Sequence, residues 1–393
     1  MARIGIFGGS FNPPHLGHTL AVREFQKKLK LDRVLLIPAS IPPHKRLSLN
    51  SPDAQTRLKL TQLAAQDLEH AEVLDIELRR EGASYTADTL EELKQYYPND
   101  ELFLLMGTDM FFSFEKWYCP TRITKLAALA VAHRSADASQ ALFDCAERLK
   151  EKFAANIYMV DNEYLPFSST SVRAMLAFDC AEHYLAPQVM EYIRANHLYY
   201  VGTNLKGLSF ERLSEVSLSL HKEKRVRHVV GCSDTAVELA RINGEDETTA
   251  RRAGILHDIT KALTDQEQLQ LCEKYAIVLS RIERDNPKLL HAKTGASIAR
   301  EVFGETDEVY QAIFWHTTGR AGMTKMEKII YLADYVEPNR DFKGIEEIRR
   351  LAYQNLDDAL LLGLRMSIEQ LTIRGMEIDP NSSAALHSLE VKQ

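Results

Sequence analysis

Hydrophobic and polar positions change their rhythm near the middle of the chain. Up to about residue 160, short apolar runs typical of buried strands alternate with stretches of helical periodicity. We expect strands at residues 3–7, 33–38, 73–78, 102–106, 128–132 and 157–160, with helices such as 54–65 and 86–96 between them. This alternation predicts an α/β fold with a parallel, doubly wound sheet.

The second half of the chain has the periodicity of helices almost throughout. After residue 168 helical patterns take over, and a helix at 190–197 is expected to close the first unit. The next stretch holds two glycines and few periodic apolar residues, so we place a linker at 201–210 between domains 1–200 and 211–393. Beyond it we expect helices at 225–242, 248–263, 265–275, 292–303, 324–335 and 345–354. The second domain is therefore predicted to be all-α.

Composition restricts the class of protein. A chain of 393 residues suggests two or three domains, and 45% hydrophobic with 26% charged residues is typical of a soluble globular protein. The net charge of -7 and the pI near 6.0 argue against nucleic acid or an anionic membrane as a partner. No apolar run approaches the ~20 residues that span a bilayer, and the amino terminus lacks the apolar segment of a signal peptide. We therefore expect a cytoplasmic protein.

The cysteines give no sign of a disulfide framework. They are odd in number, widely spaced and without a C-x-x-C pair: Cys119, Cys145, Cys180, Cys232 and Cys272. Free, buried thiols in a reducing compartment are the expected state, and a cysteine zinc site is disfavoured.

The segment GGSFNPPHLGH, residues 8–18, follows the first expected strand directly. Gly8 and Gly9 would let a phosphate approach the backbone, and a helix that starts near His18 offers N–H groups to an anion. His15 and His18 add side-chain donors. A turn with one capping and one surface histidine is the alternative, but H-x-G-H directly after a strand favours an anion site. Neither a P-loop nor G-x-G-x-x-G is matched, which disfavours the competing class, a dinucleotide oxidoreductase.

This segment resembles the [TH]-x-G-H motif of the nucleotidyltransferase superfamily. More narrowly, residues 1–200 resemble the bacterial nicotinate mononucleotide adenylyltransferases. The similarity rests on IPPHK (41–45), SYTADTL (84–90), GTDMFFSFEKW (107–117), AHR (132–134) and FSSTSVR (167–173). Phe167 and Ser10 stand where the family usually has Ile and Thr. The resemblance implies transfer of AMP from ATP to nicotinate mononucleotide, giving nicotinate adenine dinucleotide and pyrophosphate.

The resemblance also implies roles for individual residues of the first domain. His15 and His18 would be catalytic, holding the triphosphate and stabilising charge in the transition state. The expected substrate- and ATP-binding residues are Gly8, Gly9, Ser10, Lys45, Tyr85, Thr86, Gly107, Asp109, Trp117, Arg134, Ser168, Ser169, Thr170 and Arg173. Ser168 to Thr170 would start a second phosphate-binding helix, and Lys45 and Arg134 would clamp the mononucleotide phosphate. Mg²⁺ is expected to arrive with ATP, since no carboxylate cluster suited to hold it stands out.

The same resemblance assigns the recognition of the mononucleotide. Asp109 suits a ribose hydroxyl, Trp117 would stack on the pyridine ring, and backbone N–H groups near Thr86 would bind its carboxylate. Taken singly, a tryptophan is more often a core residue, a Ser-Ser-Thr run is more often a helix cap and a lone lysine or arginine is more often a surface charge.

The second domain carries histidines and aspartates in apolar helical contexts, where ionisable side chains are costly unless they are bound to something. They are His228, His257, Asp258, His291, His316 and Asp334. Any one of them alone would be interpreted as a core polar residue with satisfied hydrogen bonds. Together they indicate a metal centre, and imidazole and carboxylate without thiolate suit iron, manganese, cobalt or zinc.

This set resembles the HD superfamily of metal-dependent phosphohydrolases. Residues 210–385 resemble the bacterial HD proteins that hydrolyse diadenosine tetraphosphate symmetrically to two ADP, through the stretches 257–261, 289–296, 313–323 and 328–340. By resemblance, His228, His257, Asp258 and Asp334 are the core ligands, with Asp258 bridging, and His291 and His316 complete a second metal site. Asp258 and Lys261 would be catalytic, and Lys261 and Arg340 would neutralise polyphosphate.

These expectations describe a bifunctional cytoplasmic enzyme. Its partners would be ATP, nicotinate mononucleotide and diadenosine tetraphosphate, with Mg²⁺ on ATP and one or two transition-metal ions, iron first, in the second domain. For that domain, an HD hydrolase acting on another nucleotide and a nucleotide-sensing regulatory domain are the alternatives. A homo-oligomer is an alternative to a monomer.

Overall fold

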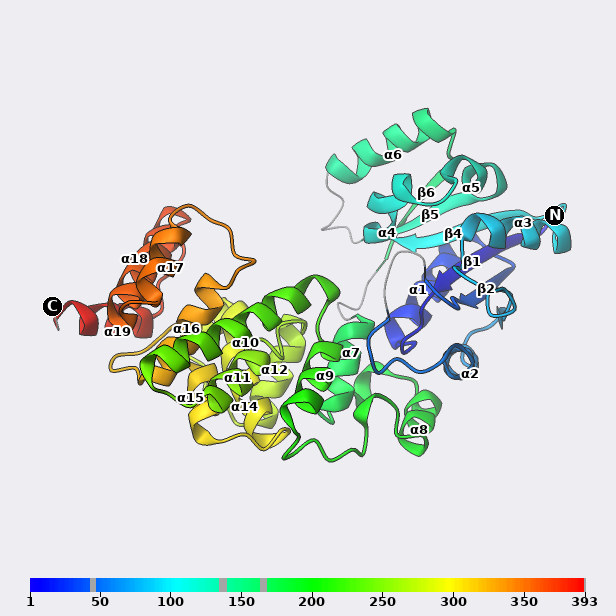
Figure 1. The fold of residues 1–393 in the computed structure, drawn as a ribbon. Helices are drawn as coiled ribbons and strands as arrows, with labels where there is room; N and C mark the ends of the chain where they lie inside the picture. Colours follow the sequence, from blue (N-terminus) through cyan, green and yellow to red (C-terminus); the bar gives the residue numbers. More distant parts are fainter. Residues whose placement is uncertain (43–46, 134–139, 163–167, 392–393) are drawn as a thin grey trace. The chain divides into compact units, whose positions relative to one another are not determined.

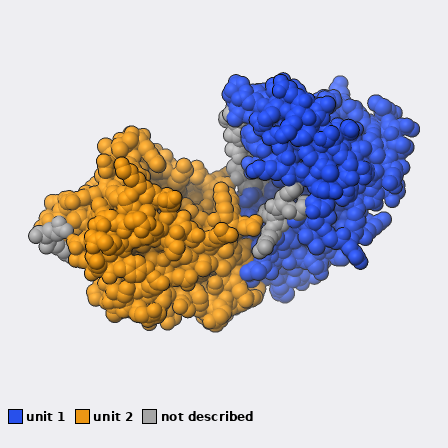
Figure 2. Space-filling view, turned by 45° about the horizontal axis from the view of Figure 1, so that its top comes forward, with its two compact units in different colours: residues 1–202 blue, residues 203–393 orange. Residues whose placement is uncertain are grey.

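The computed structural model describes residues 1–42, 47–133, 140–162 and 168–391, and Figure 1 shows the course of the chain. The chain forms two compact units, Met1–Gly202 and Thr203–Gln393, which are coloured separately in Figure 2. The expected linker at 201–210 spans the boundary between them. Within the described part of the chain, no helix combines the length and apolarity needed to cross a membrane.

The first unit is built on a parallel sheet. Its described strands are β1 (Arg3–Gly9), β2 (Arg33–Pro38), β3 (Ala71–Val73), β4 (Glu101–Gly107), β5 (Ala128–His133) and β6 (Ile157–Asp161). They lie in the order β3-β2-β1-β4-β5-β6, and every pair is parallel. The strand order therefore reverses between β1 and β4, and ligands of such sheets bind beyond the carboxyl ends of the strands at this point. The predicted doubly wound α/β fold is confirmed.

Helices cover both faces of this sheet (Figure 1). They are α1 (Leu16–Leu29), α2 (Ala54–Ala65), α3 (Thr86–Tyr96), α4 (Thr108–Ser113), α5 (Pro120–Leu126), α6 (Gln140–Phe153), α7 (Ser169–Ala177) and α8 (Pro187–Ala195). Successive strand residues enter different cores: Leu102 and Leu104 pack with α3 and α6, whereas Phe103 and Leu105 pack with α1. Apolar residues on both strand faces explain the continuous hydrophobic runs.

One expected strand is misplaced. The run at 73–78 alternates apolar and polar residues, but β3 ends at Val73, and the Leu78 N–H donates to the Asp75 carbonyl and closes a turn. Ile76 and Glu77 are adjacent and both buried, which a turn allows and an alternating strand with one solvent-facing side does not. The expectation for the cysteines needs a smaller correction, because all five are free but Cys119 is exposed.

The second unit is helical, as predicted. Its helices are α9 (Phe210–Leu220), α10 (Glu223–Asn243), α11 (Glu247–Leu256), α12 (Asp265–Lys274), α13 (Arg281–Asp285), α14 (Leu290–Glu301), α15 (Asp307–Phe314), α16 (Lys325–Val336), α17 (Ile345–Ala352), α18 (Leu356–Ile373) and α19 (Pro380–Glu390). The single helix expected at 248–263 is wrong, because α11 stops at Leu256. Beyond it, the Ile259 N–H donates a hydrogen bond to the Leu256 carbonyl and the Lys261 N–H donates one to the Asp258 carbonyl. These bonds span three residues and form turns in place of α-helix.

Candidate active sites

The segment at residues 8–18, called the opening loop below, joins β1 to α1. His15 is the residue before the first turn of α1 and is buried. The His15 backbone N–H donates to Nδ1 of His18 at 3.0 Å, so a neutral His18 carries its proton on Nε2. The two imidazole rings lie 3.7 Å apart between centroids. Burial and the neighbouring His18 lower the pKa of His15 well below its usual range, so that His15 is neutral at pH 7.

A second helix start meets this loop. Ser168 caps α7, its Oγ accepting from the Ser171 N–H, while the Ser168 N–H donates to Ser171 Oγ. The Ser169 hydroxyl donates to the Pro13 carbonyl at 3.1 Å. The structure therefore places residues 168–170 beside the opening loop, with the amino ends of α1 and α7 near each other. Two helix amino termini at one place favour an anionic ligand.

Other residues expected to bind substrate lie at the end of β4 and beside helix termini. Gly107 ends β4 and precedes α4, and Asp109 is exposed in the first turn of α4. Tyr85 precedes the first residue of α3, Thr86. The Trp117 indole N–H donates to the Ser113 hydroxyl, so this ring is anchored on one edge. Lys45 and Arg134, which the resemblance assigns to the mononucleotide phosphate, lie outside the described residues, as does Phe167.

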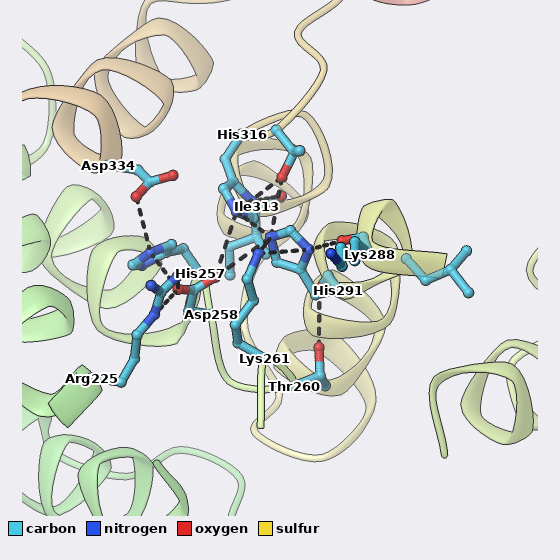
Figure 3. Close-up of polar contacts among 12 residues, drawn as sticks. Arg225, His257, Asp258, Thr260, Lys261, Lys288, His291, Ile313, His316 and Asp334 are labelled. Atoms are coloured by element: carbon cyan, nitrogen blue, oxygen red, sulfur yellow. Dashed lines mark hydrogen bonds and ion pairs between the residues drawn. The ribbon is translucent and has the colours of Figure 1, made fainter. Parts of the chain in front are cut away.

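The histidines and aspartates of the second unit come together in space (Figure 3). His228 lies in α10, His257 directly follows α11, Asp258 follows in the turn, and Asp334 lies in α16. The remaining two are His291 in α14 and His316 just after α15. Segments more than a hundred residues apart in sequence thus supply one centre, of which five residues are buried and Asp334 is partly exposed.

Asp258 divides this centre into two groups. Its Oδ2 lies 3.6 Å from Nε2 of His228 and 3.5 Å from Nε2 of His257. Its Oδ1 lies 3.5 Å from Nε2 of His291 and 3.9 Å from Nε2 of His316. The Oδ1 atom of Asp334 joins the first group, at 3.1 Å from His228 Nε2 and 3.8 Å from His257 Nε2. Each group has the residue types and spacing to hold a metal ion, with Asp258 common to both.

The hydrogen bonds of the imidazoles fit metal binding. Nδ1 of His257, His291 and His316 contacts the carbonyls of Gly254 (2.7 Å), Lys288 (2.6 Å) and Ile313 (2.6 Å). Nδ1 of His228 contacts Oε1 of Glu337 at 3.1 Å. Because a carbonyl only accepts, Nδ1 of His257, His291 and His316 carries a proton, and Nε2 is the ring nitrogen that faces the centre. Burial lowers the pKa of His291 to about 3 and that of His316 to about 4, so both are neutral at pH 7.

Cationic side chains surround the carboxylates. Nε and Nη2 of Arg225 donate to Oδ2 of Asp258, the former at 2.7 Å. Arg340 pairs with Asp334 through its Oδ1 and its carbonyl oxygen. Nζ of Lys261 lies 2.9 Å from Nε2 of His291. The centre therefore combines a carboxylate-imidazole core with three cations, which suits a metal ion together with an anionic ligand.

The comparisons with known proteins agree with this division of the chain. Residues 6–175 match the family model Cytidylyltransferase-like, and residues 225–339 match the HD domain model. The probable nicotinate-nucleotide adenylyltransferase of Carboxydothermus hydrogenoformans is 37% identical over 199 residues, which cover 50% of this chain and 98% of that protein. The chain belongs to the nicotinate-nucleotide adenylyltransferase family. A family member from Shewanella pealeana is 38% identical over 209 residues and covers the same share of the chain.

Membership in this family rests on residues 1–202, called the adenylyltransferase unit below, and disfavours the oxidoreductase alternative. Residues 203–393 are called the HD unit. A solved structure described as a predicted HD superfamily hydrolase involved in NAD metabolism, from Clostridium acetobutylicum, is 36% identical. It covers 47% of this chain and 99% of its own, with a TM-score of 0.46.

Several residues at these sites were missed by sequence reasoning. In the HD unit they are Arg225, Glu337 and Thr317, whose hydroxyl lies 3.2 Å from Nε2 of both His291 and His316. Arg225 precedes His228 by three residues, and Glu337 follows Asp334 by three, so helical spacing offered a signal for both. In the adenylyltransferase unit Arg57 was missed, although it shares a buried helix face with Leu60 and Ala64.

Proposed function

We propose that the chain is a bifunctional enzyme. Its adenylyltransferase unit transfers AMP from ATP to nicotinate mononucleotide, and its HD unit hydrolyses diadenosine tetraphosphate to two ADP. The first activity is supported above all by the family membership together with the convergence of α1, α7 and the two histidines beyond the end of β1. The second is supported by the two His/Asp groups that share Asp258. We assign the activities to residues 1–200 and 211–393, joined at 201–210, in a cytoplasmic protein.

Adenylyl transfer requires no covalent enzyme intermediate. An oxygen of the mononucleotide 5′-phosphate attacks the α-phosphorus of ATP, and the bond from that phosphorus to the bridging oxygen breaks and releases pyrophosphate. The unit contributes positioning and stabilisation of negative charge. His18 offers its Nε2–H, His15 lies against it, and the backbone of Gly8, Gly9 and Ser10 together with residues 168–170 completes the phosphate site. Mg²⁺ enters with ATP.

The mononucleotide would bind at the carboxyl end of β4 and the amino end of α3. Lys45 and Arg134 are assigned to its phosphate, and Gly107 and Asp109 to its ribose. Tyr85 and Trp117 border the pyridine ring. The N–H groups of Thr86 and Ala87, the first two residues of α3, would pair with the carboxylate of nicotinate, because the first N–H groups of a helix have no partner inside it.

In the HD unit, a transition-metal pair held by the two His/Asp groups would activate water for attack on phosphorus. Iron is our first choice of metal, with manganese, cobalt or zinc as alternatives. Arg225, Lys261 and Arg340 would bind the polyphosphate, whose P–O–P bond breaks as water adds, releasing ADP on each side. Glu337 and the three backbone carbonyls keep the imidazoles oriented.

Product analysis tests this proposal. The full chain is stripped with a chelator, then supplied with magnesium alone or with magnesium plus iron, manganese, cobalt or zinc. Each sample receives either ATP with nicotinate mononucleotide or one of a panel of dinucleoside polyphosphates, and products are separated by chromatography. We expect dinucleotide synthesis with magnesium alone, and release of ADP from diadenosine tetraphosphate only with a transition metal. Cleavage of a different nucleotide would replace the proposed substrate, and no cleavage with any metal would favour a sensing role.

A further inference from the structure

Two arginines are buried beneath the opening loop. Arg57 of α2 is 1% exposed. Its Nη1 donates to the Ser10 carbonyl at 2.8 Å and to the Ala39 carbonyl at 2.7 Å, and its Nη2 donates to the Ser40 carbonyl at 2.9 Å. One guanidinium thus joins the chain beyond β1 to the chain beyond β2, the two strand ends that border the proposed phosphate site.

Arg173 of α7 holds the same loop at a second point. It is 3% exposed, and its Nη1 donates to the carbonyls of Asn12 at 2.8 Å and Ser169 at 3.1 Å. The buried hydroxyl of Tyr199 donates to Oδ1 of Asn12 at 2.9 Å. The described bonds of Arg173 go to the protein, whereas the resemblance lists Arg173 among the substrate- and ATP-binding residues. The loop that carries the two histidines is fixed from below at residues 10 and 12.

Among the described residues neither arginine forms an ion pair, although the charge of Asp53 acts on Arg57 from beyond ion-pair distance. In the part of the chain that the structure describes, the hydrogen-bond partners of Arg57 and Arg173 are carbonyls and one hydroxyl, and Nε of each is buried without a partner. Burial lowers the pKa of Arg173 to about 10, which still leaves it charged at pH 7. Burying a cation without a counter-ion is costly. A loop that only needed fastening would be held at lower cost by neutral donors.

Holding a carbonyl also sets the direction of the next N–H. In a trans peptide the C=O and N–H bonds point to opposite sides. By binding the Ser10 carbonyl, Arg57 therefore directs the Phe11 N–H to the other side of the loop.

We infer that Arg57 is a positioning residue for the triphosphate of ATP: it fixes the opening loop at Ser10, and its buried positive charge adds to the affinity of the loop for the anion. Arg173, which the resemblance already assigns to ATP binding, holds the same loop at Asn12. This inference rests on the proposed adenylyl transfer, since it concerns the same site. The mononucleotide, which is assigned to the ends of β4 and α3, should be affected less than ATP.

Substitutions that separate charge from hydrogen bonding test the inference. Arg57→Gln keeps an amide donor but loses the charge. Arg57→Lys keeps the charge but loses the pair of guanidinium nitrogens that bind the three carbonyls. We expect Arg57→Gln to raise KM for ATP about tenfold with a smaller change in kcat and in KM for the mononucleotide, since removing a charged hydrogen-bond partner has about that effect. Arg57→Lys should recover much of the ATP affinity. Arg173→Gln and Arg173→Lys should repeat the pattern.

The control is Arg23→Gln. Arg23 lies in α1 and also donates to a backbone carbonyl, that of Asp67, but it is exposed on the surface and is not beneath the loop. Its loss should leave KM for ATP unchanged. If Arg57→Gln and Arg57→Lys lower the melting temperature equally and neither changes KM for ATP, the arginines are structural only and the inference is wrong. Should one Arg57 variant not fold, the Arg173 pair gives the same comparison.

A binding measurement separates this inference from the proposed function. The α,β-methylene analogue of ATP, with magnesium, is titrated by calorimetry into protein that carries Asp258→Ala, which removes metal-dependent binding by the HD unit. We expect the added Arg57→Gln to weaken binding about tenfold. Equal affinity with and without that substitution overturns the inference. If Arg57→Gln weakens binding of the analogue as expected but the chain without substitutions forms no dinucleotide, the proposed adenylyl transfer alone is overturned.

Discussion

The two units hold phosphate chemistry on different kinds of scaffold. In the adenylyltransferase unit the candidate groups begin the helices α1 and α7, so backbone N–H groups and two neighbouring imidazoles would face the proposed ligand. In the HD unit the candidate groups are side chains, gathered from α10, α14, α16 and the turns after α11 and α15. The first scaffold suits a metal that arrives and leaves with its nucleotide. The second suits a metal that stays, because its ligands are buried and individually oriented.

The comparison indicates that a substitution in one site should leave the activity of the other unchanged, and that the two sites should lose activity for different reasons. Loss of a carboxylate shared by both His/Asp groups should remove a whole centre. Loss of one donor at a helix start should weaken a site whose other donors remain. The predictions below begin with the largest expected effect.

Asp258→Ala should reduce hydrolysis of diadenosine tetraphosphate by more than about 10³-fold, because both metal groups lose their common ligand and metal catalysis supplies several kcal/mol. Dinucleotide synthesis should stay within about twofold, since one unit carries each site. Both rates are measured by chromatography, and bound metal is measured by elemental analysis of the purified variant. Loss of both activities with an unchanged melting curve would contradict the two-site interpretation.

His18→Ala should slow adenylyl transfer by about 10²–10³-fold, since one donor aimed at transition-state charge has an effect of this size. Hydrolysis by the HD unit should be unchanged. His70→Ala, at an exposed histidine of the same unit, serves as the matched control and should leave both activities intact. Near-normal synthesis by a folded His18→Ala variant would exclude this imidazole from the mechanism.

The carboxylate of nicotinate should matter to the adenylyltransferase unit alone. We expect kcat/KM for nicotinate mononucleotide to exceed that for the nicotinamide form by at least about tenfold. In the proposed site the N–H groups that start α3 would pair with a carboxylate, whereas an amide presents donors of its own. Steady-state rates with the two mononucleotides decide the matter. Equal values would show that the start of α3 does not bind the carboxylate.

The smallest effect concerns pH. Burial and His18 hold the pKa of His15 well below its usual value. Above pH 6.5 residue 15 is neutral in both folded and unfolded chains, and the contribution to stability is complete. As the pH falls below 6.5, the unfolded chain binds a proton that the folded chain excludes, so the free energy of unfolding falls by up to about 1.4 kcal/mol per pH unit.

His15→Gln should reduce this slope by one proton. Both proteins also carry Trp315→Phe, so that Trp117 is the one remaining tryptophan. Urea unfolding between pH 5 and 7.5, followed by tryptophan fluorescence, then measures the difference. Parallel curves for the two proteins would show that His15 is protonated in the folded state.

Much of this arrangement was predictable from periodicity, and the exceptions have physical causes. Continuous apolar runs identified the central strands because both faces of the sheet are covered. The run at 73–78 resembles a strand in its alternation of apolar and polar residues, but it forms a turn packed on the core. Its polar residue Glu77 is buried there and accepts a hydrogen bond from the Thr89 hydroxyl. The helix expected at 248–263 was too long because apolar residues such as Ile259 continue past α11 while the backbone tightens.

The candidate sites show a similar limit. The apolar helical context drew attention to the histidines and aspartates of the HD unit, since ionisable residues inside apolar helices are conspicuous. It did not identify Arg57 or the loop-directed contacts of Arg173, because a buried arginine that binds carbonyls has the same sequence pattern as one that faces solvent. The proximity of α7 to the opening loop is a long-range contact between residues 13 and 169, which no local pattern contains.

The carbonyls that orient three of the imidazoles share one further property. Gly254, Lys288 and Ile313 each precede their histidine by three residues. The direction of these side chains is thus specified within four-residue segments, before distant helices meet. Assembly of the centre therefore costs less side-chain conformational entropy. Only His228 depends on a remote partner, Glu337. A one-residue insertion within 254–257, 288–291 or 313–316 should therefore disturb the centre more than the same insertion in the loops between the helices.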